Sequence, residues 1–115
     1  VLIGVASLDR SKPFYQNVFG ITFDQFRPPF ASFMLDKLEF NLEENAPTRS
    51  VDWSKLYIGG RKNISLETDN LVAFLHLVTN NGGKIVHQPQ NKPWGWQEAV
   101  FSDLDDNEFL IEQKI

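Results

Sequence analysis

One stretch of ten residues is written twice in this chain, as LDKLEFNLEE at positions 35–44 and as LDDNEFLIEQ at positions 104–113. The two copies align without a gap, and a leucine, an aspartate, a glutamate, a phenylalanine and a second glutamate coincide. Apolar and polar residues alternate along the first copy, which is typical of a strand with one buried face. The repeat therefore predicts two equivalent strands in a duplicated fold, with Glu43 and Glu112 at the same point of each.

The residues around the first copy predict a strand, a helix and three further strands. The apolar segment 1–6 precedes a helix that ends at Gly20, a residue suited to the left-handed turn after a helix. Either Ser7 or Ser11 can cap this helix, and Pro13 favours a start at Ser11, where a proline lies within the first turn. We expect the three strands near residues 21–26, 31–35 and 38–43.

The second half repeats this order. Residues 63–68 read as a strand, and Asp69 is the predicted cap of a helix that reaches about residue 80. Apolar residues recur at helical spacing along it and form one stripe, namely Leu71, Phe74, Leu75 and Val78. Strands are expected near residues 84–88, 97–101 and 108–113. The alternation does not assign the two faces of 97–101, because both carry apolar residues.

A βαβββ unit present twice predicts an α+β fold in which two paired modules form an eight-stranded, cup-shaped sheet with the helices outside. We expect a single domain over residues 1–115, with module one at about 1–44, a linker at 45–62 and module two at 63–115. Polar residues of both modules fall on the face that the helices leave bare. This face is then a polar concave pocket or plain solvent-exposed surface.

The composition narrows the function classes. The net charge is −4 and the pI about 5.0, so the chain has no basic stripe for nucleic-acid phosphates. The absence of cysteine excludes disulfides and thiolate metal sites, and it favours a cytoplasmic protein. No apolar run approaches the roughly 20 residues that span a bilayer, so we expect no membrane partner.

Four stretches carry a resemblance to a known family: DRSKPFYQNVFGI at 9–21, NISLETDNLVAFLHLVTNNGGKI at 63–85, KPWGWQEAVFSD at 92–103 and DLDDNEFLIEQ at 103–113. Together they resemble the vicinal oxygen chelate superfamily of glyoxalases, bleomycin-resistance proteins and extradiol dioxygenases. The resemblance implies paired βαβββ modules and a homodimer. For the enzymes of the family it also implies a divalent metal, held on the concave face by His, Glu or Gln.

The positions that match the family's metal ligands carry other residues here. By the resemblance they fall at Asn63, at Leu110, at Asn41 and at or just before Val1. An asparagine is a poor ligand for zinc, iron or nickel, and a leucine is none. Glu112 lies two residues beyond Leu110 on the same face of the strand. It can act as a metal ligand only if the metal site is displaced by about 7 Å. We therefore expect no metal ligands and no cofactor.

The remaining candidates point to binding. Trp94 and Trp96 offer flat apolar surface and good ring faces for a cation, unless they pack on a partner or in the core. His76 and His87 fall off the ligand positions and are expected on the surface. The predicted pocket residues are Asn41, Glu43, Asn63, Trp94, Trp96, Leu110 and Glu112.

We thus expect a metal-free small-molecule binding protein of the glyoxalase/bleomycin-resistance type, with a role such as antibiotic resistance. It would sequester a flat or cationic ligand in an acidic aromatic pocket of a homodimer. The alternative is a metal-dependent lyase, thiol transferase or dioxygenase with a nonstandard ligand set, such as Glu43 and Glu112. A non-catalytic interaction module also fits the fold. No catalytic residue is assigned, although a glutamate buried in an apolar cup can act as an acid or base.

Overall fold

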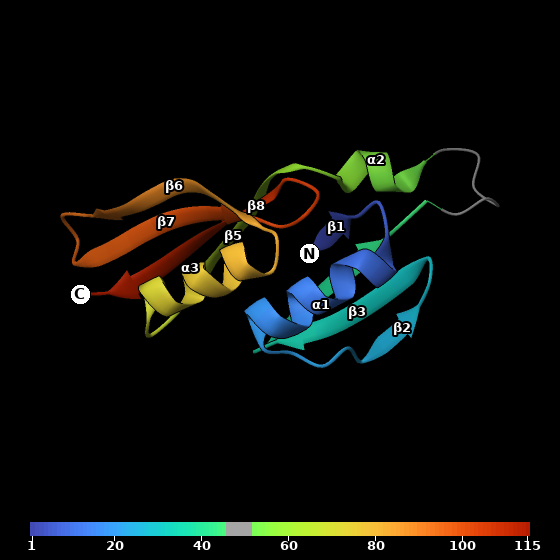
Figure 1. Cartoon of the computed structure of the whole chain (residues 1–115), viewed down its shortest axis with the longest axis horizontal. Coiled ribbons are helices and arrows are strands. Elements are labelled where there is room, and N and C mark those ends of the chain that lie inside the picture. The colour runs from blue at the N-terminus through green and yellow to red at the C-terminus, as the bar shows by residue number, and fades with distance from the viewer. Residues whose placement is uncertain (46–51) are drawn as a thin grey trace.

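The computed structural model describes residues 1–45 and 52–115, and the molecule is elongated, with extents of 49 × 26 × 24 Å (Figure 1). The first module comprises β1 (Leu2–Gly4), α1 (Leu8–Phe19), β2 (Gln25–Arg27), β3 (Phe30–Leu35) and β4 (Leu38–Glu43). A short helix, α2 (Trp53–Tyr57), precedes the second module, which comprises β5 (Gly60–Glu67), α3 (Leu71–Asn80), β6 (Lys84–Asn91), β7 (Trp96–Ser102) and β8 (Asn107–Lys114). None of the described helices is long and apolar enough to cross a membrane.

Each module forms its own four-stranded sheet, in the orders β1-β4-β3-β2 and β5-β8-β7-β6. In both sheets the first and last strands of the module pair in parallel, and the other neighbours are antiparallel. The repeated stretch thus supplies β4 and β8, which occupy the same place in the two sheets. The predicted α+β fold with two βαβββ modules is confirmed. Hydrogen bonds hold its eight strands as two sheets of four.

Both helices form where expected, but the start at Ser11 that Pro13 favoured is wrong, because α1 begins at Leu8. Ser7, the earlier of the two candidate caps, accepts a hydrogen bond from the Arg10 backbone N–H at 3.2 Å. The helix runs through the exposed Pro13, which removes only one backbone donor, and the early start places Leu8 in the core. In the second module the predicted cap Asp69 is wrong by one residue.

Asn70 caps α3 instead, because its side chain accepts from the Ala73 N–H at 3.0 Å. This start puts the fully buried Leu71 at the first helical position.

Several predicted strands have different bounds in the structure: the segment 1–6 shortens to β1, and β5 begins before residue 63. The segment 21–26 contributes only β2, since Ile21 and Phe23 pack against the core before pairing begins. The segment 84–88 is longer and reaches Asn91, with two irregularities in its pairing to β7. The predicted linker contains α2, while its residues 46–51 lie outside the described residues.

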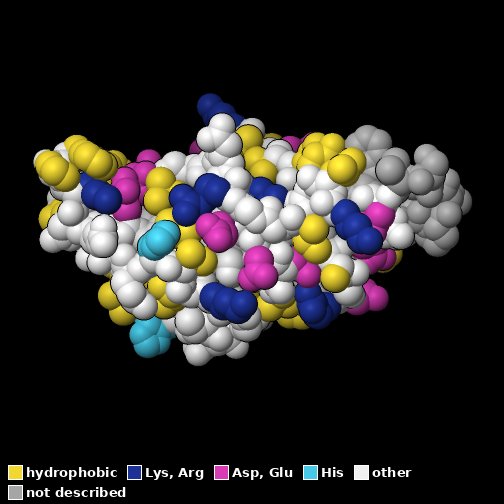
Figure 2. Space-filling view, turned by 90° about the horizontal axis from the view of Figure 1, so that it is seen from above, with side chains coloured by type: hydrophobic (Ala, Val, Ile, Leu, Met, Phe, Trp, Pro, Cys, Tyr) yellow, Lys and Arg dark blue, Asp and Glu magenta, His cyan; other side chains and the backbone are white. Residues whose placement is uncertain are grey.

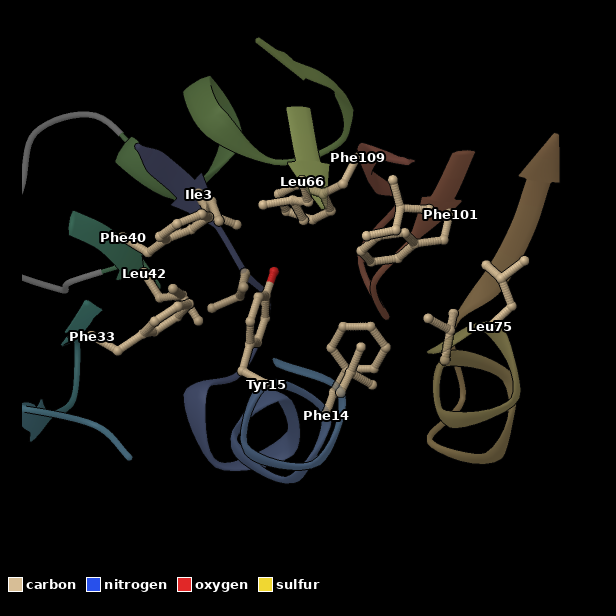
Figure 3. Packing of buried hydrophobic residues seen from close by; sticks show 14 of the residues in the cluster. Ile3, Phe14, Tyr15, Phe33, Phe40, Leu42, Leu66, Leu75, Phe101 and Phe109 are labelled. Atoms are coloured by element: carbon tan, nitrogen blue, oxygen red, sulfur yellow. The ribbon is translucent and has the colours of Figure 1, made fainter. Parts of the chain in front are cut away.

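One hydrophobic core joins the two sheets. Figure 3 shows its aromatic side chains gathered from both modules around α1. Phe19, at the end of α1, contacts Phe33 and Phe40 of the first sheet, with ring centroids 5.8 and 5.9 Å away. It also contacts Phe101 and Phe109 of the second sheet at 6.2 and 5.8 Å. Both sheets therefore turn the same kind of face, the apolar one, toward a shared interior.

A buried polar network links α1 to the turn before β8. The Tyr15 hydroxyl donates to Asp103 Oδ2 at 2.5 Å. Asp103 Oδ1 accepts the backbone N–H groups of Asp105 and Asn107 at 2.9 and 3.0 Å. The Asn107 amide donates to the Gly4 carbonyl at 3.0 Å, so the network also reaches β1. Burial raises the pKa of the Asp103 carboxyl and, together with the charge of Asp103, raises the pKa of Tyr15 well above its usual value.

A lysine closes the junction between α2 and β5. The Lys62 ammonium donates to the backbone carbonyls of Tyr57 and Gly59, at 2.5 and 3.1 Å. Burial lowers the pKa of Lys62, against the raising effect of the Asp103 charge. The lysine thereby satisfies carbonyl groups at the end of a short helix.

Candidate functional site

Each sheet has one face on the shared core and one face turned away from it, here called the open face. On β8 the alternation is strict: Phe109 and Ile111 are buried, while Leu110 and Glu112 on the open face are only partly buried. β4 follows the same pattern, with Asn41 and Glu43 on its open face. The predicted assignment of polar residues to one face of each strand is confirmed for both strands.

The open face of the second sheet carries three glutamates in one row. Glu67 on β5 lies opposite Glu112 on β8, and Glu112 lies opposite Glu98 on β7. Neighbouring strands are about 5 Å apart, so the three carboxylates form a band of negative charge across the sheet. Ser65 donates a hydrogen bond to Glu112 Oε1 at 2.5 Å, which holds this carboxylate in place on the open face. The band attracts a cation to this face.

A hollow of about 350 Å³ adjoins this band on the second sheet. Its polar walls include Arg61, His87, Lys92 and Glu98, and Arg61 also pairs with Glu108 at 3.3 Å. Its apolar part is formed by Ala99, Val100 and Leu110 of the two central strands. Charges of both signs thus surround a small apolar surface.

The two tryptophans lie at one end of the molecule. Trp94 sits in the tight turn between β6 and β7 and is 63% exposed, whereas Trp96 begins β7 opposite Lys114 and is half-buried. The turn is closed by a hydrogen bond from the Lys92 N–H to the Trp96 carbonyl at 2.7 Å. The Ile115 N–H donates a hydrogen bond to the Gly95 carbonyl at 2.9 Å. Apolar side chains gather at the left end of the molecule in Figure 2.

The first sheet has a different open face. Asn41 pairs with Leu2 on one side and with Ser32 on the other, and Glu43 pairs with Phe30. Leu2 and Phe30 are exposed large apolar side chains, as is Met34 on the same face. This open face is therefore more apolar than the one that carries the glutamate band.

The seven predicted pocket residues fall into two groups. Asn41 and Glu43 lie on the open face of the first sheet, and the other five belong to the second module. The structure brings Leu110 and Glu112 together on β8, while Asn63 is exposed on β5 where the pairing with β8 is irregular. Of the seven, Leu110 lines the hollow on the second sheet.

Sequence reasoning missed most residues of this hollow, among them His87 and Glu98. His87 is exposed, as expected, yet it also lines the hollow from β6, opposite Val100. Glu98 was not assigned to a face, because the apolar residues on both sides of β7 obscure the alternation. The repeat offered no signal for either residue, since the corresponding β3 and β2 positions carry unlike side chains.

The donor set at the family's metal positions does not fit a transition metal. Asn41 and Asn63 offer only amide oxygens, and Leu110 offers no donor atom. Within residues 1–45 and 52–115, no three His, Asp or Glu side chains are placed to hold one metal ion.

Comparison with known proteins identifies the family. The sequence model of the Glyoxalase/Bleomycin resistance protein/Dioxygenase superfamily matches residues 1–111. The chain belongs to this superfamily. A search of curated proteins gave no match.

Three solved structures illustrate the shared fold of the superfamily. A glyoxalase/bleomycin resistance protein/dioxygenase family enzyme from Burkholderia phytofirmans PsJN is 17% identical, with a TM-score of 0.76 over 100% of this chain and 96% of that one. TioX from Micromonospora sp. ML1 gives the same identity, TM-score and coverage. A superfamily member from Sphaerobacter thermophilus DSM 20745 is 24% identical, with a TM-score of 0.68 over 99% and 94% of the two chains. At such identities the likeness establishes the fold and nothing finer.

Proposed function

We propose that this superfamily member is a metal-free binding protein that sequesters a small flat or cationic molecule on the open face of its second sheet. The observation that carries the proposal is the row of Glu67, Glu112 and Glu98 across three neighbouring strands. A negative band beside an apolar hollow suits a guest that combines positive charge with a flat apolar body. Drug sequestration in the cytoplasm, as in antibiotic resistance, is the physiological role we infer.

The aromatic part of the site comes from the tryptophans. Trp96 lies on β7 two residues before Glu98, so both side chains point to the open face. The exposed Trp94 extends the apolar surface beyond the sheet. An indole ring is the best natural partner for a cation, and stacking on a flat guest adds apolar contact.

A homodimer is part of the proposal. The open faces of both sheets point away from the core and carry exposed apolar side chains, such as Phe30 and Met34 on the first sheet. A second copy would cover this surface and close the pocket over the guest. Sedimentation equilibrium would then give about twice the mass of one chain, which is 13.2 kDa.

The binding test is a fluorescence titration on a Trp53→Phe background, in which the signal comes only from Trp94 and Trp96. Ethidium, acridine orange and bleomycin serve as cationic probes, and fluorescein as an anionic one. We expect the cationic probes to quench the tryptophan fluorescence. Glu98→Gln should lower their affinity about fivefold, because the loss of an exposed charge pair costs roughly 1 kcal/mol of binding free energy. Asp9→Asn, on the outer face of α1, is the matched control and leaves the affinity unchanged.

Elemental analysis after growth in metal-supplemented medium separates this proposal from a metal enzyme. We expect no stoichiometric divalent metal. One metal per chain that disappears in Glu112→Gln, or cationic probes that fail to change the fluorescence at high concentration, would overturn the proposal. The metal-dependent alternative has no observation in its favour among the described residues.

A further inference from the structure

A second and larger hollow, of about 770 Å³, lies at the seam between the two modules. It is bounded by the end of α1, the turn between β3 and β4, the end of β5, and side chains of α3 and β8. None of the seven predicted pocket residues lines it. We call it the seam cleft, and its volume is that of a site for a drug-sized molecule.

The walls of the seam cleft are apolar and come from both modules. Phe19 and Leu35 contribute from the first module, and Phe74 from α3; all three are partly buried. Leu66 and Ile111 form a buried floor. Leu38 lies at the mouth and is 42% exposed, so a guest can cover further apolar surface there.

The rim of the seam cleft is polar and carries unequal charge. Asp36 and Lys37 lie side by side in the β3–β4 turn and offset each other. Glu67, at the end of β5, is the remaining charged residue among those that line the cleft. The β5 end of the rim is therefore negative.

The backbone of β5 adds hydrogen-bond acceptors at the same end. β5 is an edge strand of its sheet, because β8 pairs with only one of its sides. Carbonyl groups on the other side of an edge strand remain available to a donor. An ammonium group carries three donors, and a carboxylate with neighbouring carbonyls can satisfy them.

We propose that the seam cleft is a second binding site, for an amphipathic amine with an apolar body in the cleft and its ammonium group at Glu67. This goes beyond the proposed function, because the site shares only Glu67 with the glutamate band, its other walls are different residues, and it is complete within one chain. An amine is favoured over a carboxylic acid of the same shape, since the Glu67 carboxylate attracts a cation and repels an anion. The apolar walls supply affinity, and the rim sets the choice of head group.

The test compares decylammonium, decanoate and decanol as competitors of the apolar fluorescent probe 1-N-phenylnaphthylamine. We expect decylammonium to displace the probe at about fivefold lower concentration than decanol, and decanoate to be the weakest. Glu67→Gln removes the preference for the amine and leaves decanol unaffected. Leu38→Asp abolishes binding of the probe, while Val72→Asp, an equally polar change on the exposed side of α3, does not.

Three outcomes would overturn the proposal. The first is that the three competitors displace the probe equally well from the unaltered chain. The second is that Leu38→Asp leaves probe binding intact. The third is that Leu38→Asp converts a dimer into a monomer in sedimentation. The last result would mean that a second copy fills the cleft. Failure of the seam-cleft proposal can be distinguished from failure of the proposed function. Leu38→Asp should leave the tryptophan response to flat cations unchanged. Glu98→Gln should weaken that response and leave probe binding in the seam cleft unchanged.

Discussion

Glu44 and Gln113 hold the same position in the two modules and perform the same contact. The Glu44 carboxylate accepts a hydrogen bond from the backbone N–H of Leu8 at 2.8 Å, and the Gln113 amide oxygen accepts one from Leu71 at 2.7 Å. Leu8 and Leu71 are the first residues of α1 and α3. The residue that ends the repeated stretch therefore caps the helix of its own module, and an acid and an amide are interchangeable in this role.

This equivalence predicts the effect of substituting Glu44. Glu44→Gln retains the accepting oxygen and should cost only the charge–dipole part, about 0.3–1 kcal/mol. Glu44→Ala leaves the helix N–H without its acceptor and should cost about 1–2 kcal/mol in the free energy of unfolding. Urea denaturation of the two variants measures the difference. Equal losses for Gln and Ala would show that the contact itself contributes nothing.

A second prediction concerns alkaline pH. The folded-state pKa of Tyr15 is raised above its unfolded value, so the stability it contributes is full below about pH 10 and is lost as the pH rises through the folded pKa. The urea midpoint should fall steeply above pH 10. Tyr15→Phe should flatten this fall, and Tyr57→Phe, which leaves the buried phenol in place, should not. A parallel fall in all three proteins would contradict the assignment.

A third prediction concerns Asp103, whose pKa burial also raises. The stability that Asp103 contributes is full below its unfolded pKa and decreases as the pH rises through its folded pKa. Acidification toward about pH 4 therefore increases this contribution to the free energy of unfolding. Asp103→Asn places an amide donor opposite the Tyr15 hydroxyl or the Asn107 amide. We expect a loss of about 2–3 kcal/mol at pH 7, measured by urea denaturation.

The matched control is Asp106→Asn, an exposed residue of the same turn. A loss in this variant as large as that in Asp103→Asn would assign the effect to the turn sequence rather than to the network.

A fourth prediction concerns Gly83, after α3. A Cβ at this position would lie 2.5 Å from the Ser102 carbonyl oxygen and 2.8 Å from side-chain atoms of Phe14 and Val78. Gly83→Ala should cost about 3 kcal/mol, because the backbone oxygen cannot move aside. Gly20→Ala, with a left-handed backbone but nothing within 4 Å, should cost about 1–2 kcal/mol. A smaller loss for Gly83 than for Gly20 in thermal unfolding would refute the close contact.

Much of the fold could be predicted because the chain repeats its own pattern. The period-two alternation around Phe40 and Phe109 identified two strands, their buried faces and their equivalence. The helix caps were less predictable. Ser7 and Ser11, or Asp69 and Asn70, have similar local propensity, and the choice depends on tertiary contacts that bury Leu8 and Leu71.

The candidate site was harder to predict than the fold. The glutamate band depends on the register between β5, β8 and β7, which places Glu98 beside Glu112. Local alternation cannot give a register between distant strands. The seam cleft depends on the relative placement of two modules, and this is decided by the packing of Phe19 between their sheets. Neither module alone encodes that arrangement.

The position of Phe19 bears on how such a chain can arise by duplication. Its ring fills the space between a pair of stacked phenylalanines in one half and another pair in the other half. A single module before duplication would have exposed this aromatic surface to water, unless two identical copies packed together through it. Gene fusion would then have converted an interface between two molecules into an interface within one chain. Each module could afterwards change its exposed residues independently.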